Sequence, residues 1–361
     1  MTVAASSPIP PPIDLFTPPK VNDYNRTGLD FRRPLPRPKV RGAVIDFHTH
    51  LFAHRHLKDW QATNRHYGID AFITMTPLEE ALGVQRALPG KVQFIAIPKW
   101  GDAGPYWVDE WLRRLEAFYN LGSRIIKFHM APGTMAARGY SLEHPGIQKI
   151  MDEAVARDMI LMSHVGDPDT WYATRYTDHA RFGDRETHYR IWEEQLHARR
   201  DRVWVGAHLG GNPENPARLQ HLLDAHPNLH LDLSATRWMV REVSRRRDAM
   251  REFVIRNADR LLWGSDQVSG DARQFDFLAS RLWCHRKLWE TAYVGPSPIA
   301  DPDAPQDQQP TIRGLALPDE VLQKLYHDNS AGLLARFGVK FAEADGPAEG
   351  SKRRRAMESV S

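Results

Sequence analysis

Two histidines separated by one residue follow an apolar run near the start of the chain. The run is Ala43-Val44-Ile45-Asp46-Phe47, and it leads into His48-Thr49-His50. In a β-strand residues i and i+2 point to the same face, so His48 and His50 would project side by side. Two imidazoles held in this way suit a divalent metal with nitrogen ligands. The alternative is a pair of unrelated histidines on a half-buried strand, because short motifs often occur by chance.

Other apolar, strand-like runs end in residues of similar chemistry. The residues at or directly after the ends of these runs are Lys127 and His129, His164, His208, and Asp266. A lone histidine at a strand end is usually a hydrogen-bonded structural residue. At corresponding ends of a closed barrel, however, these side chains would converge on one axis and favour a metal centre.

The elements that must position these residues alternate along the chain between apolar runs and amphipathic segments. The strand-like runs are Ala43–His48, Ala71–Met75, Val92–Pro98, Arg124–Met130, Met159–His164, Val203–His208, Leu229–Ser234 and Leu261–Ser265. The predicted helices are Leu78–Leu88, Trp107–Leu121, Ile147–Arg157, Arg185–Arg200, Pro216–His226, Arg245–Asn257 and Pro318–Phe337. Near-continuously apolar strands alternating with helices indicate a parallel sheet covered by helices. Eight such strands predict a distorted (β/α)8 barrel of the α/β class.

The barrel is expected to span residues 43–338, between two segments of different composition. Residues 1–42 are proline-rich and should be extended and irregular, with Ile13, Leu15, Phe16, Tyr24 and Phe31 as apolar anchors onto the body or a partner. Residues 339–361 form a basic tail that we expect to be mobile.

Two long segments follow predicted strand ends, on the side where barrel active sites lie. They are Val165–Asp184, after the fifth run, and Val268–Leu317, after the eighth. Long loops at this position often form lids or substrate walls. The alternative is a surface insertion with no catalytic role.

Composition and charge exclude several classes of protein. The net charge of +3 over 361 residues is mild, and the run Lys352–Arg355 is expected to be a solvated tail, so nucleic-acid binding is not expected. A single cysteine, Cys284, excludes an internal disulfide and fits a reducing compartment. No apolar run approaches the ~18 residues of a membrane span, and residues 1–7 lack the pattern of a secretory signal. We therefore expect a cytoplasmic protein without a membrane partner.

The sequence resembles the amidohydrolase superfamily, specifically amidohydrolase family 2, over roughly residues 43–338. The matching motifs are Asp46-Phe47-His48-Thr49-His50, Ile125-Ile126-Lys127-Phe128-His129, Ser163-His164, Ala207-His208-Leu209-Gly210-Gly211, Leu262-Trp263-Gly264-Ser265-Asp266, and Leu317-Pro318-Asp319-Glu320 with Tyr326-His327-Asp328-Asn329. The resemblance implies a metal-dependent barrel enzyme. It does not decide the reaction, because the family includes hydrolases, decarboxylases and hydratases.

Ligand chemistry and the resemblance together suggest roles for the metal site. His48, His50 and His164 would supply neutral imidazoles, with Asp266 as the anionic ligand or near-ligand. One zinc ion is the first expectation, and iron, manganese, nickel or a second ion are left open. The metal would lower the pKa of a bound water towards ~7, and Asp266 would take its proton. His208 would polarise the substrate or steady the attacking water, while in two-metal relatives the same position is a ligand. The Gly210-Gly211 pair would allow a close backbone approach.

Lys127 is ambiguous, because in two-metal relatives the equivalent lysine is carbamylated and bridges the ions. We favour an unmodified Lys127 that pairs with a substrate carboxylate or a nearby acid, since a buried unpaired ammonium is costly. His129, Arg237 and Trp100 are further candidates for substrate binding. For Arg237 and Trp100, local salt bridges or packing are equally good explanations.

The intact pair His48 and His50 favours hydrolysis, because many decarboxylating relatives have glutamate at the first position. The predicted substrate is small and carries a carboxylate, and the bond that is cleaved is an ester, lactone, amide or C–C bond. The alternative is decarboxylation or hydration of an aromatic or unsaturated acid on the same site. A third hypothesis is a binding protein without activity. A homodimer is also possible, since dimers are common in this branch.

Overall fold

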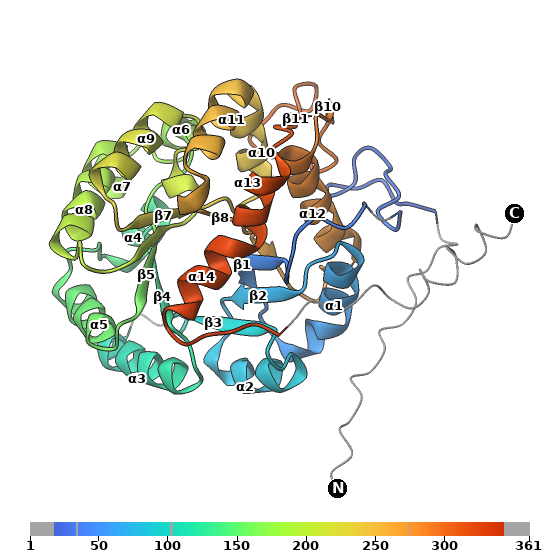
Figure 1. Ribbon diagram of the computed structural model, residues 1–361. Helices are drawn as coiled ribbons and strands as arrows, with labels where there is room; N and C mark the ends of the chain where they lie inside the picture. Colours follow the sequence, from blue (N-terminus) through green and yellow to red (C-terminus); the bar gives the residue numbers. More distant parts are fainter. Residues whose placement is uncertain (1–17, 34, 102–103, 274, 343–361) are drawn as a thin grey trace, which may run out of the picture.

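A parallel sheet curled into a barrel, with helices around it, forms the body of the protein (Figure 1). The computed structural model describes residues 18–33, 35–101, 104–273 and 275–342. Within these ranges the sheet follows the order β8-β7-β6-β5-β4-β3-β2-β1-β9. The strands are β1 Ile45–His50, β2 Ala71–Thr74, β3 Val92–Ala96, β4 Ile125–His129, β5 Ile160–His164, β6 Trp204–Gly206, β7 Leu229–Asp232, β8 Leu261–Leu262 and β9 Gln267–Val268. The predicted distorted (β/α)8 barrel is confirmed.

Residues 261–268 close the barrel. The first part of this segment, β8, pairs with β7, and the last part, β9, pairs with β1. Between them the Phe47 amide donates to the Trp263 carbonyl at 2.9 Å, and the Asp266 amide donates to the His48 carbonyl at 2.8 Å. The predicted strand Leu261–Ser265 is therefore observed only at Leu261–Leu262, and the irregular connection to β9 places Asp266 directly beside β1.

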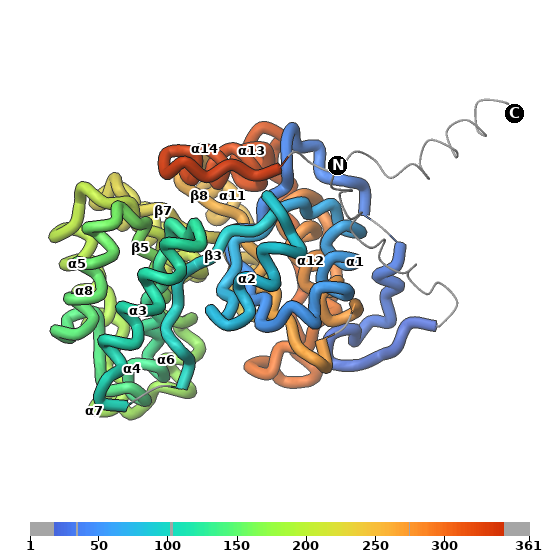
Figure 2. The backbone as a smooth tube through the Cα atoms, turned by 90° about the horizontal axis from the view of Figure 1, so that it is seen from below, coloured from blue at the N-terminus to red at the C-terminus, as the bar shows by residue number. Residues whose placement is uncertain are grey.

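Helices cover the outside of the barrel and its two ends. They are α1 Leu57–His66, α2 Leu78–Ala87, α3 Trp107–Asn120, α4 Pro132–Arg138, α5 Pro145–Ala156, α6 Asp169–Thr174, α7 His179–Phe182, α8 Arg185–Ala198, α9 Pro216–Ala225, α10 Arg237–Arg245, α11 Arg247–Arg256, α12 Phe275–Glu290, α13 Asp319–Gln323 and α14 Asn329–Ala335. Figure 2 shows α13 and α14 on the opposite side of the molecule from α4, α6 and α7. Local sequence sets several helix starts: the Asp184 carboxylate caps α8, and Asn215 caps α9 directly before Pro216.

Four predicted segments differ from the observed elements. The segment Val268–Leu317 contains α12 and a hairpin of β10 (Val294–Pro296) and β11 (Thr311–Arg313), so it is not one long loop. Twelve of the sixteen residues of α12 are buried, which hides the amphipathic period that would reveal a helix. The predicted helix Arg245–Asn257 corresponds to α11 and includes the last residue of α10. The predicted helix Pro318–Phe337 is interrupted by a turn of π-helix at Lys324–Asp328. Similarly, Val165–Asp184 contains the short helices α6 and α7.

Residues 18–33 and 35–42 have no helix or strand and lie against α12 and α1. Phe31 is buried, and the Tyr24 ring meets the Phe277 ring edge-on at 5.3 Å between centroids. The Tyr67 hydroxyl donates to the Phe31 carbonyl at 3.1 Å. These two predicted anchors therefore contact the body. The other three, Ile13, Leu15 and Phe16, and the basic run 352–355 lie outside the described residues.

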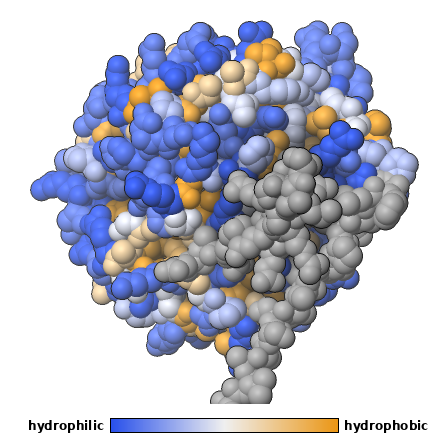
Figure 3. All heavy atoms as spheres, turned by 45° about the vertical axis from the view of Figure 1, so that its right-hand side comes forward, coloured by the Kyte–Doolittle hydropathy of each residue, from blue (hydrophilic) through white to orange (hydrophobic). Residues whose placement is uncertain are grey.

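No helix in the described ranges combines the length and apolarity needed to cross a bilayer. The face shown in Figure 3 is mainly hydrophilic where it is coloured, with hydrophobic residues in small separate areas.

Candidate metal centre and active site

The predicted histidines meet at the ends of the strands. The ring centroids of His48 and His208 are 4.7 Å apart, those of His208 and His164 are 4.6 Å apart, and those of His164 and His129 are 4.7 Å apart. These rings come from four strands or their ends, β1, β6, β5 and β4. The barrel thus brings together residues that are up to 160 positions apart, as the strand-end pattern predicts.

His48, His50 and Asp266 form a group that could hold a metal ion. One ligand atom from each lies within 4.8 Å of the others. The Nε2 atom of His50 is 3.2 Å from Oδ1 of Asp266, and Nε2 of His48 is 3.7 Å from the same oxygen. Two imidazole nitrogens and one carboxylate oxygen fit a divalent ion such as zinc. The residues present therefore fit the metal that the resemblance implies.

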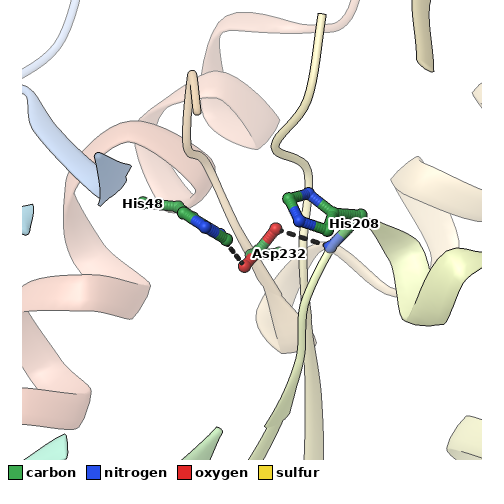
Figure 4. A group of neighbouring side chains, drawn as sticks. All are labelled: His48, His208 and Asp232. Carbon is green, nitrogen blue, oxygen red and sulfur yellow. Dashed lines mark hydrogen bonds and ion pairs between the residues drawn. The ribbon is translucent and has the colours of Figure 1, made fainter. Parts of the chain in front are cut away.

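Asp232, at the end of β7, holds His48 from behind (Figure 4). Its Oδ2 lies 2.8 Å from Nδ1 of His48, and both side chains are completely buried. Burial lowers the pKa of His48, so the imidazole is neutral. With its single proton donated from Nδ1 to Asp232, the lone pair on Nε2 faces the site. A carboxylate behind a ligating histidine is the usual way to fix the tautomer of a metal ligand.

The Asp232 carboxylate also organises the loop that carries His208. Its Oδ1 accepts hydrogen bonds from the His208 amide at 2.9 Å and the Ser234 amide at 3.0 Å. The Ser234 hydroxyl donates to the same oxygen, so this hydroxyl can accept from Nδ1 of His208, 2.8 Å away. Burial opposes ionisation of Asp232, but its bonds to His48 and Ser234 and the nearby His208 hold its pKa well below the usual value.

His208 is consequently held with its Nε2 unprotonated. The bond to Ser234 places its proton on Nδ1, and burial lowers the pKa of His208 well below the usual value. The backbone of His208 is left-handed, with φ of 56°. Gly211 follows at φ of 74°, where an added Cβ would lie 2.1 Å from the Gly166 carbonyl oxygen. The expected close backbone approach is therefore present, between the loops after β5 and β6.

Backbone strain is concentrated at this rim. The loops after β6, β7 and β8 each contain a residue other than glycine with positive φ: His208 at 56°, Ala235 at 76° and Asp266 at 53°. Each costs on the order of 1 kcal/mol or more, and such residues often cluster at functional sites. At Asp266 this backbone turns the carboxylate towards the two histidines of β1.

Lys127 is buried at 1% exposure, and its Nζ lies 2.8 Å from Nε2 of His48. Among the described residues its hydrogen-bond partner is this imidazole, and pairing with a substrate carboxylate remains a prediction. Burial lowers the pKa of Lys127 to about 8, while the charges of Asp266 and Asp232 act in the opposite direction. An ion bound to Nε2 of His48 would require this ammonium to move away.

His164 lies at the same rim but bonds to a different residue. Its Nε2 is 3.1 Å from Oδ1 of Asp167, whose Oδ2 accepts a hydrogen bond from the Tyr176 hydroxyl at 2.7 Å. In the described part of the chain His164 is not in the metal-binding group of His48, His50 and Asp266. Its role as a ligand remains a prediction: binding through Nε2 would require this nitrogen to leave Asp167, whereas binding through Nδ1 would keep that hydrogen bond.

The three other predicted substrate residues also lie near the rim. His129 accepts from or donates to the Thr134 hydroxyl through Nδ1, at 2.8 Å. The Trp100 ring, 39% exposed, meets the His129 ring at 5.7 Å between centroids. Arg237 begins α10 and is exposed. Their contacts with substrate remain predictions.

Sequence reasoning missed the carboxylates that support the site. Asp232 and Asp46 are completely buried. Asp46 accepts hydrogen bonds from the amides of Ser265 at 2.9 Å and His48 at 3.2 Å, and so ties β1 to the segment that closes the barrel. Burial raises the pKa of Asp46 to about 7. The sequence signal for both residues was an aspartate inside an apolar strand, because a buried carboxylate needs hydrogen-bond or ionic partners.

Comparison with known proteins identifies the class. A family model described as Amidohydrolase (Amidohydro_2) matches residues 94–336. The chain therefore belongs to the amidohydrolase family, and it is an enzyme. Its site supports a divalent metal. No curated protein matches the sequence.

Solved structures resemble the fold at low identity. An amidohydrolase from Burkholderia multivorans with bound zinc is 13% identical, with a TM-score of 0.49, over 81% of this chain and 99% of that one. A probable 2-pyrone-4,6-dicarboxylic acid hydrolase from Acinetobacter baumannii is 11% identical, with a TM-score of 0.47, over 81% and 99%. A 4-oxalomesaconate hydratase from Rhodopseudomonas palustris is 13% identical, with a TM-score of 0.45, over 82% and 97%.

Proposed function

We propose that this enzyme is a metal-dependent hydrolase that uses activated water to cleave an ester, lactone, amide or C–C bond in a small carboxylate-bearing substrate. One observation supports the proposal most: His48, His50 and Asp266 gather at the carboxyl end of the barrel. The hydrogen bond to Asp232 keeps the His48 proton on Nδ1, so Nε2 has a free lone pair. A single zinc ion is the first candidate, because a site with two imidazoles and one carboxylate suits it.

The residues divide the chemistry between binding the ion and moving a proton. When bound by His48, His50 and Asp266, a divalent ion would act as a Lewis acid and lower the pKa of water near it. Before an ion binds, burial opposes ionisation of Asp266, but the hydrogen bond from His50 and the surrounding imidazoles hold its pKa well below the usual value. Asp266 is then an ionised acceptor for the proton that the attacking water loses.

His208 is proposed to steady the attacking water. Its Nδ1 proton is used by Ser234, so its Nε2 can accept a hydrogen bond but not donate one. This arrangement supports a role for His208 as a hydrogen-bond acceptor from water, and not as a donor that polarises the substrate carbonyl. The same lone pair would also serve as a ligand if a second ion were bound.

Hydrolysis is preferred to decarboxylation or hydration because both histidines of β1 are present around one position, with His48 buried and His50 half-buried. The direct test incubates the zinc-loaded enzyme with carboxylate-bearing esters, lactones and amides. Acid release from esters and lactones is followed by pH-stat titration, ammonia or amine release is measured for amides, and carbon dioxide is measured in parallel on aromatic and unsaturated acids. We expect acid release that His48→Ala and Asp266→Asn abolish while circular dichroism remains unchanged. Full activity after removal of the metal would refute the proposal. Carbon dioxide release without hydrolysis would identify the enzyme as a decarboxylase and not a hydrolase.

A further inference from the structure

Arg281, on α12, is a buried cation that no carboxylate of the described chain neutralises. Four arginines within the described residues are buried: Arg114, Arg241, Arg281 and Arg286. The other three each have a carboxylate oxygen at 2.6 Å, from Glu79, Glu242 and Glu290 respectively. Arginine stays charged in proteins, so a buried guanidinium needs an anion or a strong set of acceptors.

The contacts of Arg281 supply only part of what a buried guanidinium needs. Its Nη1 donates to the Phe277 carbonyl at 3.0 Å, and its Cζ lies 3.6 Å from the centroid of the Phe277 ring. The carbonyl and the ring fix the position of the guanidinium, but neither carries a negative charge. The side chain is 8% exposed, so it is held in place and only partly open to solvent.

The helix α12 packs against the residue that follows Asp266. The Gln267 side-chain amide donates to the Leu278 carbonyl, three residues before Arg281, at 3.1 Å. The charges around Arg281 are mainly positive. Its pKa is lowered to about 9, first by burial and then by the charge of Arg237, whereas Asp266 acts in the opposite direction. Arg273 adds a further positive charge and lies 5.2 Å from the same Phe277 ring. Asp266, the carboxylate that acts on Arg281, is already bonded to His50.

The start of α10 adds to this positive region. Arg237 is the first residue of α10, which is in contact with α12, and no side chain caps this helix. The free amides at a helix N-terminus favour an anion. A buried cation without a carboxylate and an uncapped helix start therefore adjoin the same end of the barrel as Asp266.

We propose that Arg281, assisted by Arg237, binds a carboxylate group of the substrate beside Asp266. A guanidinium fits a carboxylate through two parallel hydrogen bonds, and such a bond would also neutralise the buried charge. Because this position adjoins Asp266, its role as a substrate site rests on the proposed function. It assigns recognition of the carboxylate to α12 and leaves Lys127 to the metal side of the site.

The first part of the test measures the unliganded, zinc-loaded protein by thermal unfolding. Arg281→Met should raise Tm by about 2 °C or more, because it removes a buried charge without a partner. Arg241→Met should lower Tm by a similar amount, because it leaves the buried carboxylates of Glu242 and Asp301 without their arginine. A Tm loss for Arg281→Met like that of Arg241→Met, or failure to fold, would overturn the proposal.

The second part measures stabilisation by acetate, malonate, succinate, benzoate and isophthalate, each against its neutral amide at equal ionic strength. At least one carboxylate should raise the Tm of the wild type more than its amide does, and more than inorganic phosphate does. Its affinity, from calorimetric titration, should fall about tenfold or more in Arg281→Met and in Arg237→Gln. The exposed-residue control Arg86→Gln on α2 should not change it.

The outcomes separate this proposal from the proposed function. No carboxylate effect on the wild type, a stronger effect of phosphate, or equal affinity in Arg281→Met would overturn the carboxylate subsite even if hydrolysis were demonstrated. Carboxylate binding that depends on Arg281 would support it even if the zinc-loaded enzyme released carbon dioxide instead of hydrolysing esters.

Discussion

The carboxylate of Asp232 lies 2.8 Å from Nδ1 of His48, and neither side chain is exposed to solvent. This bond determines which nitrogen of His48 carries the proton, and therefore whether the other nitrogen can bind an ion. The same carboxylate holds the His208 amide at 2.9 Å. One residue at the end of β7 thus orients two histidines from β1 and β6.

Asp232→Asn should weaken zinc binding by about 10- to 100-fold. The amide nitrogen of asparagine cannot accept the His48 proton, so the variant favours protonation of Nε2 and loss of the lone pair. The measurement is competition for zinc against a chromophoric chelator. Asp70→Asn is a suitable control, since Asp70 is also buried but accepts from the Val44 amide and Arg37. Equal zinc affinity in Asp232→Asn and wild type would show that the bond does not control the ligand.

His164→Ala should weaken zinc binding less than His48→Ala does, if His164 joins the site only after leaving Asp167. A ligand that must first break a hydrogen bond contributes less net free energy to metal binding than a ligand that is already oriented towards the ion. Both variants can be measured by the same chelator competition. A larger loss for His164→Ala would mean that the arrangement around Asp167 is not that of the metal-bound enzyme.

Gly264→Ala should displace His48. A Cβ at this position would lie 2.8 Å from Cβ of His48 and 3.0 Å from its backbone nitrogen, so β1 or the closing segment must shift. We expect a loss of about 1–3 kcal/mol in the free energy of unfolding, with weaker zinc binding. Gly332→Ala on α14 is the matched control, because a Cβ there meets nothing within 4 Å. It should raise stability by about 0.5–1 kcal/mol. Similar behaviour of the two variants in both measurements would contradict the close approach at Gly264.

Glu214→Gln should change stability in a pH-dependent way. Burial raises the pKa of Glu214 to about 7, although the Asp169 amide that bonds to it acts in the opposite direction. The folded protein therefore holds this proton more tightly than the unfolded chain does. This difference stabilises the folded protein. The stabilisation is fully present below the pKa of the unfolded state, ~4.3, and is lost as pH rises through the pKa of the folded state, about 7.

Glutamine keeps an acceptor for the Asp169 amide but cannot ionise. The free energy of unfolding of Glu214→Gln, relative to wild type, should therefore rise by about 2–3 kcal/mol between pH 5 and pH 8. Denaturant titrations at the two pH values measure this change. A constant difference, or one that falls with pH, would contradict the raised pKa.

Much of the barrel was predictable because its signals are local. The runs ending at His129 and His164 are apolar and short, and each begins and ends within one or two residues of the observed strand. Convergence of their ends follows from the geometry of a closed parallel barrel. The pair His48 and His50 required only the two-residue period of a strand.

The remaining features depend on partners distant in the chain. α12 is buried on most sides, so its sequence lacks an apolar stripe, and Arg281 within it looks like a surface residue. Asp232 is meaningful only because β1 places His48 against it, 184 residues away in the sequence. The orientation of His164 depends on Asp167, which lies in a loop whose conformation no periodic pattern describes.

The central claim is that His48, His50 and Asp266 jointly bind one ion at the mouth of the barrel. Anomalous diffraction from zinc-loaded crystals, recorded above and below the zinc edge, tests it most directly. We predict one peak at about 2.0–2.3 Å from Nε2 of His48, Nε2 of His50 and an Asp266 oxygen, with Lys127 displaced from His48. A protein with no peak there, or with zinc bound by other side chains, would contradict the account.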